Sequence, residues 1–333
     1  MSLSKLLAQH ERESLYSGAN SAVWYSHNHA TKLAKRGARE EDYVATLITN
    51  GIPNLANRWA PLLHKKGVGL KLSGVFCHGH PQVAFGTPRS QVELADLLVV
   101  HQHTQNDRCT ARAMLLQAKM SSDSTHTLVS TDAQLRLFSV WPPFEFVTGG
   151  LAPGERDLRE KGSGSRYALV LNRAAYPEQI TWADQCPWGA SPATQHLSAD
   201  RSLAKLLGDI LLGKDGRPFR LGTPKDDWSR TIQELLEVTG RRTYKRANIE
   251  RGDTGRLVAA QHGSAGLMLV AESGPTANVN SKKSNESLNE RFFGHVPGAG
   301  TDGGGVDIAS DDRSRNSEGG ISALIIETTE GPR

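Results

Sequence analysis

Residues 113–120 read AMLLQAKM, and this apolar run, which ends with Gln117 and Lys119, decides the fold. A second run, VELADLLVV at residues 92–100, is apolar apart from two acids. Strands that are apolar on both faces are typical of the centre of a sheet that helices cover on each side. We therefore predict an α/β fold, with a mixed central sheet flanked by helices and a smaller C-terminal α+β part.

Weaker patterns on both sides of these runs predict the remaining elements. Acids at residues 40–42, followed by apolar residues at helical spacing, indicate the start of a helix across residues 39–64. Residues 51–53 (GIP) should interrupt it. The further predicted helices lie at residues 131–140, 202–212 and 227–238, and the further strands at residues 68–77, 82–86, 166–171, 266–272 and 321–328.

The length of 333 residues suggests two domains at roughly 150 residues each. A loop rich in Pro, Trp and Gly at residues 176–193 places the boundary, so the predicted domains are residues 1–186 and 187–333. Residues 274–319 are rich in Gly, Ser, Asn and Asp, and such a composition buries too little apolar surface to offset the entropy of ordering. We predict a disordered loop there, between two strands that pair with each other in antiparallel fashion.

The composition excludes several classes of protein. Hydrophobic residues make up 38% and charged residues 22% of the chain, which rules out a fully disordered protein. The net charge of +4 permits a nucleic-acid partner without requiring one. Three cysteines do not make a disulfide framework, so we expect a cytoplasmic protein. No run reaches the roughly 18 apolar residues of a membrane span, and the first residues lack the pattern of a signal peptide.

Three polar residues on the two apolar strands carry the predicted chemistry. Gln117 and Lys119 point to the same face because strand side chains alternate, and Asp96 on the neighbouring strand can supply the partner that buried polar groups need. Carboxylate and amide oxygens are hard ligands, suited to Mg²⁺ or Mn²⁺. A lysine beside such a metal can orient the attacking water and offset charge on a phosphoryl oxygen. The set therefore indicates metal-dependent hydrolysis of a phosphodiester.

The order of these elements resembles the PD-(D/E)XK nuclease superfamily. The residues that carry the resemblance are Asp96 and residues 117–119 (QAK), with an acidic helix start at residues 40–41 (EE) upstream. The Gln-x-Lys form is similar to that of Mrr-like restriction endonucleases. The resemblance covers about residues 38–172; the chain departs from the pattern because no proline precedes Asp96 and because the second ligand is Gln.

The resemblance implies a restriction-endonuclease-like nuclease domain in residues 1–186 that hydrolyses DNA with Mg²⁺ or Mn²⁺. In that superfamily the strand-borne acid and the following Gln or Glu bind the metal, and the lysine is catalytic. Carried over, the implied catalytic residues are Asp96, Gln117 and Lys119, and the implied metal ligands are Asp96, Gln117, the backbone carbonyl of Ala118 and either Glu41 or Glu40. Prokaryotic defence or restriction systems are the expected setting by analogy.

Other interpretations remain open from the residues. Gln117 and Lys119 can simply end a strand, with Asp96 capping a turn, which would leave a non-catalytic nucleic-acid-binding or regulatory protein on a degenerate nuclease fold. A zinc-dependent hydrolase is a further alternative, because histidines two apart on a strand share a face. Its candidate ligands are the pairs His27 and His29, His78 and His80, and His101 and His103, with Cys77 and Cys109 close by in the sequence.

A basic run after the last predicted helix is the candidate nucleic-acid contact. Its members are Arg241, Arg242, Tyr244, Lys245 and Arg246. Cations can bind a phosphate backbone and the tyrosine can stack on a base, although cations are also favoured at the end of any helix. The predicted partners are thus nucleic acid, DNA in the first place, with a second copy of the chain and proteins of a defence system as further candidates.

Overall fold

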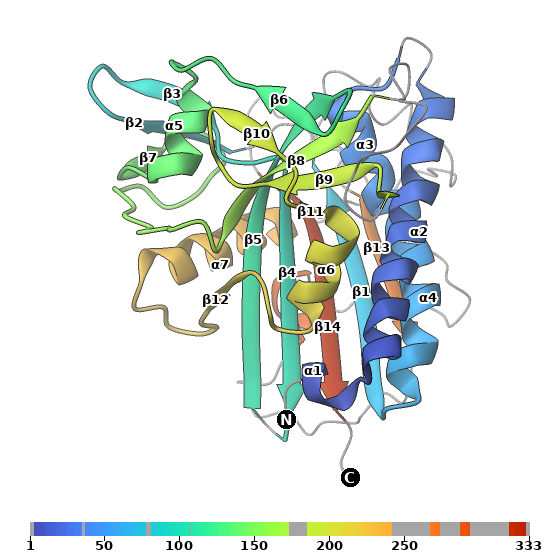
Figure 1. The fold of residues 1–333 in the computed structure, drawn as a ribbon. Coiled ribbons are helices and arrows are strands. Elements are labelled where there is room, and N and C mark those ends of the chain that lie inside the picture. Colours follow the sequence, from blue (N-terminus) through green and yellow to red (C-terminus); the bar gives the residue numbers. More distant parts are fainter. Residues whose placement is uncertain are drawn as a thin grey trace.

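The computed structural model describes residues 3–34, 37–77, 81–106, 108–172, 185–241, 267–273, 287–293 and 320–330. Within these residues the largest unit is a nine-stranded mixed sheet (Figure 1). In spatial order its strands are β11 (Arg201–Ser202), β9 (Trp188–Ser191), β8 (Ser165–Leu171), β5 (Arg108–Ser121), β4 (Leu97–Gln105), β14 (Ser322–Glu330), β1 (Val68–Phe76) and β13 (Leu267–Ser273), with β12 (Arg217–Phe219) paired to β5.

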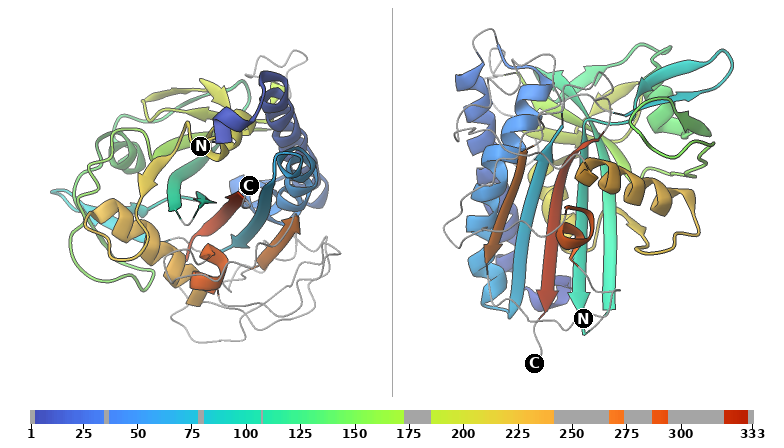
Figure 2. Two further views of the ribbon diagram at one scale, coloured as in Figure 1. Left: turned by 90° about the horizontal axis from the view of Figure 1, so that it is seen from below. Right: turned by 180° about the vertical axis from the view of Figure 1, so that it is seen from behind.

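Two helical layers cover the faces of this sheet (Figure 2). The first contains α2 (Gln9–Leu33), α3 (Glu40–Thr46), the π-helical turn η1 (Leu47–Gly51), α4 (Ile52–His64) and α6 (Leu203–Leu211). The second contains α5 (Ala133–Val140), α7 (Asp227–Arg241) and α9 (Leu288–Phe293). Alternation along the strands supplies both cores, because Val99 and Leu116 face the first layer while Leu98 and Leu115 face the second.

Short strands gather at the end of the sheet where β4 begins and β5 ends (Figure 1). There β2 (Gln82–Phe85) pairs with β3 (Ser90–Glu93) and β7 (Phe144–Phe146), and β6 (Thr125–Thr127) pairs with β10 (His196–Ser198). Near the opposite end, α1 (Leu3–Leu6) precedes α2. The start of β4 follows β3 after only three residues, so the backbone bends sharply from the small sheet into the central one.

The predicted α/β class, a mixed central sheet flanked by helices, is confirmed. The sheet also contains strands from both sides of residue 186, so the predicted domain division runs through it. Most of the strands and helices predicted from a pattern are present within a few residues of their expected bounds. The strand predicted at residues 92–100 is wrong in its bounds, because this stretch contains the end of β3, a bend at residues 94–96 and the start of β4. Another exception is the break at residues 51–53: Gly51 ends η1, and Pro53 lies in the first turn of α4, where a missing N–H is tolerated.

The 25-residue helix α2 was not predicted. Apart from Leu15, its buried apolar residues are small ones, Ala19, Ala22, Val23 and Ala30. These positions follow helical spacing, but alanines give a weak hydrophobic signal. No helix among the described ranges is both long enough and apolar enough to cross a bilayer.

The predicted pairing of the last two strands is wrong. β13 and β14 each run antiparallel to β1 on its two opposite edges, so they are parallel to each other and not neighbours. β14 is buried along most of its length and lies between β1 and β4, where a strand that is apolar on both faces belongs. A short turn therefore cannot join the two strands, because the connection has to pass β1.

The predicted disordered loop at residues 274–319 is partly wrong. Within it, α9 is described, and the rest of the segment lies outside the described residues. Leu288 and Phe293 of α9 are 0% and 5% exposed and belong to the core under α7. A short apolar patch inside a polar segment is enough to bind this helix to the body.

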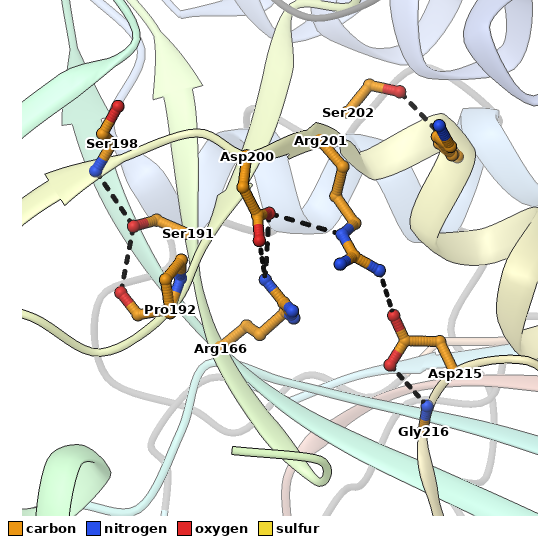
Figure 3. Close-up of polar contacts among 10 residues, drawn as sticks. Arg166, Ser191, Pro192, Ser198, Asp200, Arg201, Ser202, Asp215 and Gly216 are labelled. Carbon is orange, nitrogen blue, oxygen red and sulfur yellow. Dashed lines mark hydrogen bonds and ion pairs between the residues drawn. The ribbon is translucent and has the colours of Figure 1, made fainter.

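A chain of ion pairs holds the short strands at the β11 edge of the sheet (Figure 3). One guanidinium nitrogen of Arg166 donates to both oxygens of Asp200 at 3.0 Å. Asp200 also accepts from Arg201, and Arg201 in turn donates to Asp215 at 2.5 Å, beside the N–H of Gly216. The chain thus joins β8, β11 and the loop after α6. Because three of its members are mostly shielded from solvent, it orders this edge more than an exposed pair would.

Candidate functional site

Asp96 is fixed against β5 by backbone and side-chain hydrogen bonds. It lies in the bend just before β4, not on the strand itself as the sequence pattern suggested. Its backbone N–H donates to the carbonyl of Leu116 at 3.0 Å, and its Oδ2 accepts from the N–H of Ala118 at 2.6 Å and from Nε2 of Gln117 at 2.5 Å. The side chain is 8% exposed, so a buried carboxylate sits directly beside Gln117.

Gln117 and Lys119 point to the same face of β5, and both meet Gln134 at the start of α5. Nε2 of Gln134 donates to Oε1 of Gln117 at 2.5 Å, and also to the carbonyl of Glu93 at 3.3 Å. Oε1 of Gln134 accepts from Nζ of Lys119 at 3.3 Å. Asp96, Gln117 and Lys119 are the three polar residues predicted from the sequence. Together with Gln134 they therefore form one hydrogen-bonded cluster.

The first turn of α5 places Gln134, which sequence reasoning missed. Asp132 caps this helix by accepting from the N–H of Leu135 at 2.8 Å. Leu135, Leu137 and Phe138 bury the helix against the sheet and so hold its polar first turn over the end of β5. The available signal was a polar residue just inside a capped, otherwise apolar helix.

Of the two candidate acids upstream, the structure brings Glu40 to the cluster's strand. Oε1 of Glu40 accepts from the N–H of Met120 at 3.1 Å, so the carboxylate lies at the end of β5, one residue from Lys119 in the chain. Glu41 instead forms an ion pair with Arg39 at 3.2 Å, and both of these side chains are exposed. Glu40 is the first residue of α3, and from this position its side chain reaches the end of β5.

Tyr167 is a second residue that the sequence did not single out. It is the register partner of Gln117 on β8 and is 0% exposed. Its hydroxyl finds no hydrogen-bond partner among the described residues. Burial, followed by the charges of Asp132 and Asp96, raises the pKa of this phenol well above its usual range. Tyr167 therefore stays neutral and brings an O–H donor close to the cluster.

The histidine pairs of the zinc alternative are engaged in other contacts. His27 stacks on Tyr43 with ring centroids 4.5 Å apart, and His29 lies against Tyr25. Residues 78–80, which include the second pair, lie outside the described residues. In the described parts of the chain, no three His, Cys, Asp or Glu side chains come together in a metal-binding group.

The third pair belongs to a polar network between β4 and β14. Both His101 and His103 contact Oγ1 of Thr328 at 2.9 Å. The other ring nitrogen of His101 lies 3.0 Å from the carbonyl of Ile210, and that of His103 lies 3.4 Å from Glu330. Burial, reinforced by His103, lowers the pKa of His101 to about 3.

The network should make the fold sensitive to acid. His101 stays neutral in the folded protein but gains a proton in the unfolded chain. Its contribution to the free energy of unfolding is therefore fully present above pH 6.5 and is lost as the pH falls toward about 3. The slope contributed by one such group is at most about 1.4 kcal/mol per pH unit. Between these two pH values, the free energy of unfolding measured with urea should change less steeply with pH in His101→Asn than in the wild type.

His64→Asn is the matched control, because His64 is exposed at the end of α4 and should leave the slope unchanged. Three groups near His101 also affect the pH dependence of stability. Burial lowers the pKa of His103, the charge of Glu330 raises it, and the charge of Arg112 lowers the pKa of His101. An equal slope in wild type and His101→Asn would contradict the assignment of the acid sensitivity to His101.

The predicted nucleic-acid run cannot be placed. Arg241 is the last residue of α7, and Arg242, Tyr244, Lys245 and Arg246 lie outside the described residues. The run therefore stays a prediction from the sequence.

No protein-family model, curated protein or solved structure matches this chain. The cluster of Asp96, Gln117, Lys119 and Gln134 is accordingly the observation on which a function has to rest.

Proposed function

We propose that the chain is a Mg²⁺-dependent endonuclease that hydrolyses phosphodiester bonds of DNA from the Asp96 cluster. The supporting observation is that Asp96 is held by the N–H of Ala118 and by the side chain of Gln117, with Lys119 on the same face. Segments 21 residues apart thus place a carboxylate, an amide and an ammonium at one end of a rigid sheet.

The donor set fits a hard divalent cation. Asp96, the Gln117 side-chain oxygen and the Ala118 carbonyl would hold Mg²⁺ or Mn²⁺, with Glu40 as a further carboxylate at the strand end and waters in the remaining positions. When bound, the cation would lower the pKa of a water and offset charge on a phosphate. Histidine and cysteine are not part of this set, which disfavours zinc.

The side chains around the cation have separate tasks in the proposed reaction. Lys119 is only part-buried and donates from Nζ, so it can orient an attacking water or stabilise charge that develops on a phosphoryl oxygen. Asp96 is held on β5 through its own backbone N–H and through its side chain, which would fix a bound cation relative to Lys119. The hydroxyl of Tyr167 is a further donor in the same region.

Cleavage of supercoiled plasmid DNA by the full chain tests this proposal. The wild type should cleave with Mg²⁺ or Mn²⁺ and not with EDTA, and Lys119→Ala should lower the rate on the order of a hundredfold, the usual cost of one transition-state contact. Lys205→Ala is the control, because Lys205 is exposed on α6 across the sheet.

Two results would count against the proposal. Binding of DNA in a gel-shift experiment without metal-dependent cleavage would favour the non-catalytic alternative. Equal cleavage by wild type and Lys119→Ala would place the chemistry elsewhere.

A further inference from the structure

The hydrogen bonds around Gln117 have a fixed direction. The carbonyl of Glu93 can only accept, so Gln134 turns its nitrogen toward it. That same nitrogen donates to the oxygen of Gln117, and the nitrogen of Gln117 then donates to Asp96. Lys119 can only donate, and it meets the oxygen of Gln134. Each contact in the series pairs a donor with an acceptor, so one amide's orientation dictates the other's.

This direction turns the Gln117 oxygen away from Asp96. An amide nitrogen does not bind a metal, so a cation shared by Asp96 and Gln117 requires Gln117 to rotate by half a turn. The Gln117 nitrogen would then face the Gln134 nitrogen, donor against donor, and Gln134 would have to rotate as well. Its nitrogen would in turn face Nζ of Lys119, and the contact that now holds Lys119 would break.

We infer that Gln117 and Gln134 form a two-state amide relay, in which the rotation of both amides, which a divalent cation beside Asp96 would require, frees Lys119 from Gln134. The inference rests on the proposed function and makes Gln134 a positioning residue. In the closed state observed here, Lys119 is held by Gln134. In the open state the Gln117 oxygen would face Asp96 and could hold a cation there, Gln134 would accept from the Gln117 nitrogen, and Lys119 would be free to meet a phosphate.

The relay lowers the apparent affinity for metal. Opening loses the Gln134 contacts to Glu93 and Lys119, and one or two net hydrogen bonds correspond to roughly 5- to 30-fold in an equilibrium constant. A competent state that is populated only in part weakens binding by that fraction. Removing the amide of Gln134 should therefore strengthen metal binding, the opposite of what the loss of a structural contact does.

Two variants separate the two functions of Gln134. Gln134→Met keeps the length of the side chain but binds neither Gln117 nor Lys119. Gln134→Glu can only accept, so it turns the Gln117 nitrogen toward itself, presents the Gln117 oxygen to Asp96, and keeps Lys119 as an ion pair. Both variants should bind Mn²⁺ about 5- to 30-fold more tightly than the wild type in calorimetric titration without DNA.

Acetic anhydride labelling of Lys119, read by mass spectrometry, reports its release. In the wild type, labelling should rise when Mn²⁺ is added. It should be high without metal in Gln134→Met and low with or without metal in Gln134→Glu. Lys205 serves as the internal control, since its labelling should not respond to metal. Thermal unfolding confirms that each variant is folded.

The outcomes distinguish the relay from the function on which it rests. If the wild type binds Mn²⁺ but Lys119 labelling does not change, or if Gln134→Met binds metal equally or more weakly, the relay is wrong while the metal site stands. If the wild type binds neither Mn²⁺ nor Mg²⁺, both the relay and the proposed function are wrong. The wild-type labelling alone decides the matter if a variant fails to fold.

Discussion

Replacing Gln117 by glutamate should keep DNA cleavage within roughly tenfold of the wild-type rate and lower the Mg²⁺ concentration that cleavage needs. Glutamate has nearly the shape of glutamine and is the more usual ligand. Gln117→Ala should lose on the order of a hundredfold, and Asp96→Asn more, since it removes the buried carboxylate.

The same substitution should make stability depend on metal. Nε2 of Gln117 lies 2.5 Å from Oδ2 of Asp96, so Gln117→Glu places two carboxylates in contact. In EDTA their repulsion should lower the melting temperature, and Mg²⁺ should restore it. The wild type should show a smaller shift.

Cleavage rates and melting temperatures of the three variants, each with Mg²⁺ and with EDTA, decide the role of Gln117. A folded but inactive Gln117→Glu beside an active Gln117→Ala would exclude Gln117 as a metal ligand. In that event the cluster is a strand-end hydrogen-bond network, in which an added charge is costly and alanine is mild.

Gly240→Ala should displace α9 from the body of the protein. A Cβ at Gly240 would lie 1.8 Å from the carbonyl oxygen of Phe292 and 2.7 Å from its carbon. Backbone atoms cannot rotate away as a side chain does, so α7 and α9 have to separate. Leu288 and Phe293 would then be exposed, and at about 1.5–3 kcal/mol for each buried apolar side chain the expected loss is roughly 3–6 kcal/mol.

Urea unfolding and limited proteolysis around residues 287–293 measure this effect. Arg230→Ala is the control on the same helix, because Arg230 is 44% exposed and forms only a surface ion pair with Asp227. Its expected cost is below about 1 kcal/mol. Unchanged unfolding and proteolysis of Gly240→Ala would mean that α9 does not pack closely on α7 in solution.

Part of the candidate site was readable from the sequence. The apolar runs at residues 92–100 and 113–120 predicted two central strands, and alternation put Gln117 and Lys119 on one face. The register that brings Asp96 to Ala118 agrees with that expectation. The sequence pattern did not predict that Gln134 belongs to the site. A contact between the first turn of a helix and the end of a strand depends on how the helix packs on the sheet.

The sequence by itself determined most of the long strands and the helices other than α2, and it placed Gln117 and Lys119 on one face of β5, because these features follow from local periodicity. Only the tertiary structure decided that β14 enters between β1 and β4, that Thr328 meets His101 across 227 positions, and that Gln134 joins Gln117 to Lys119. Such contacts depend on which of many competing pairings buries the most apolar surface and satisfies the most polar groups. That comparison involves the whole chain and leaves no periodic trace in any one segment.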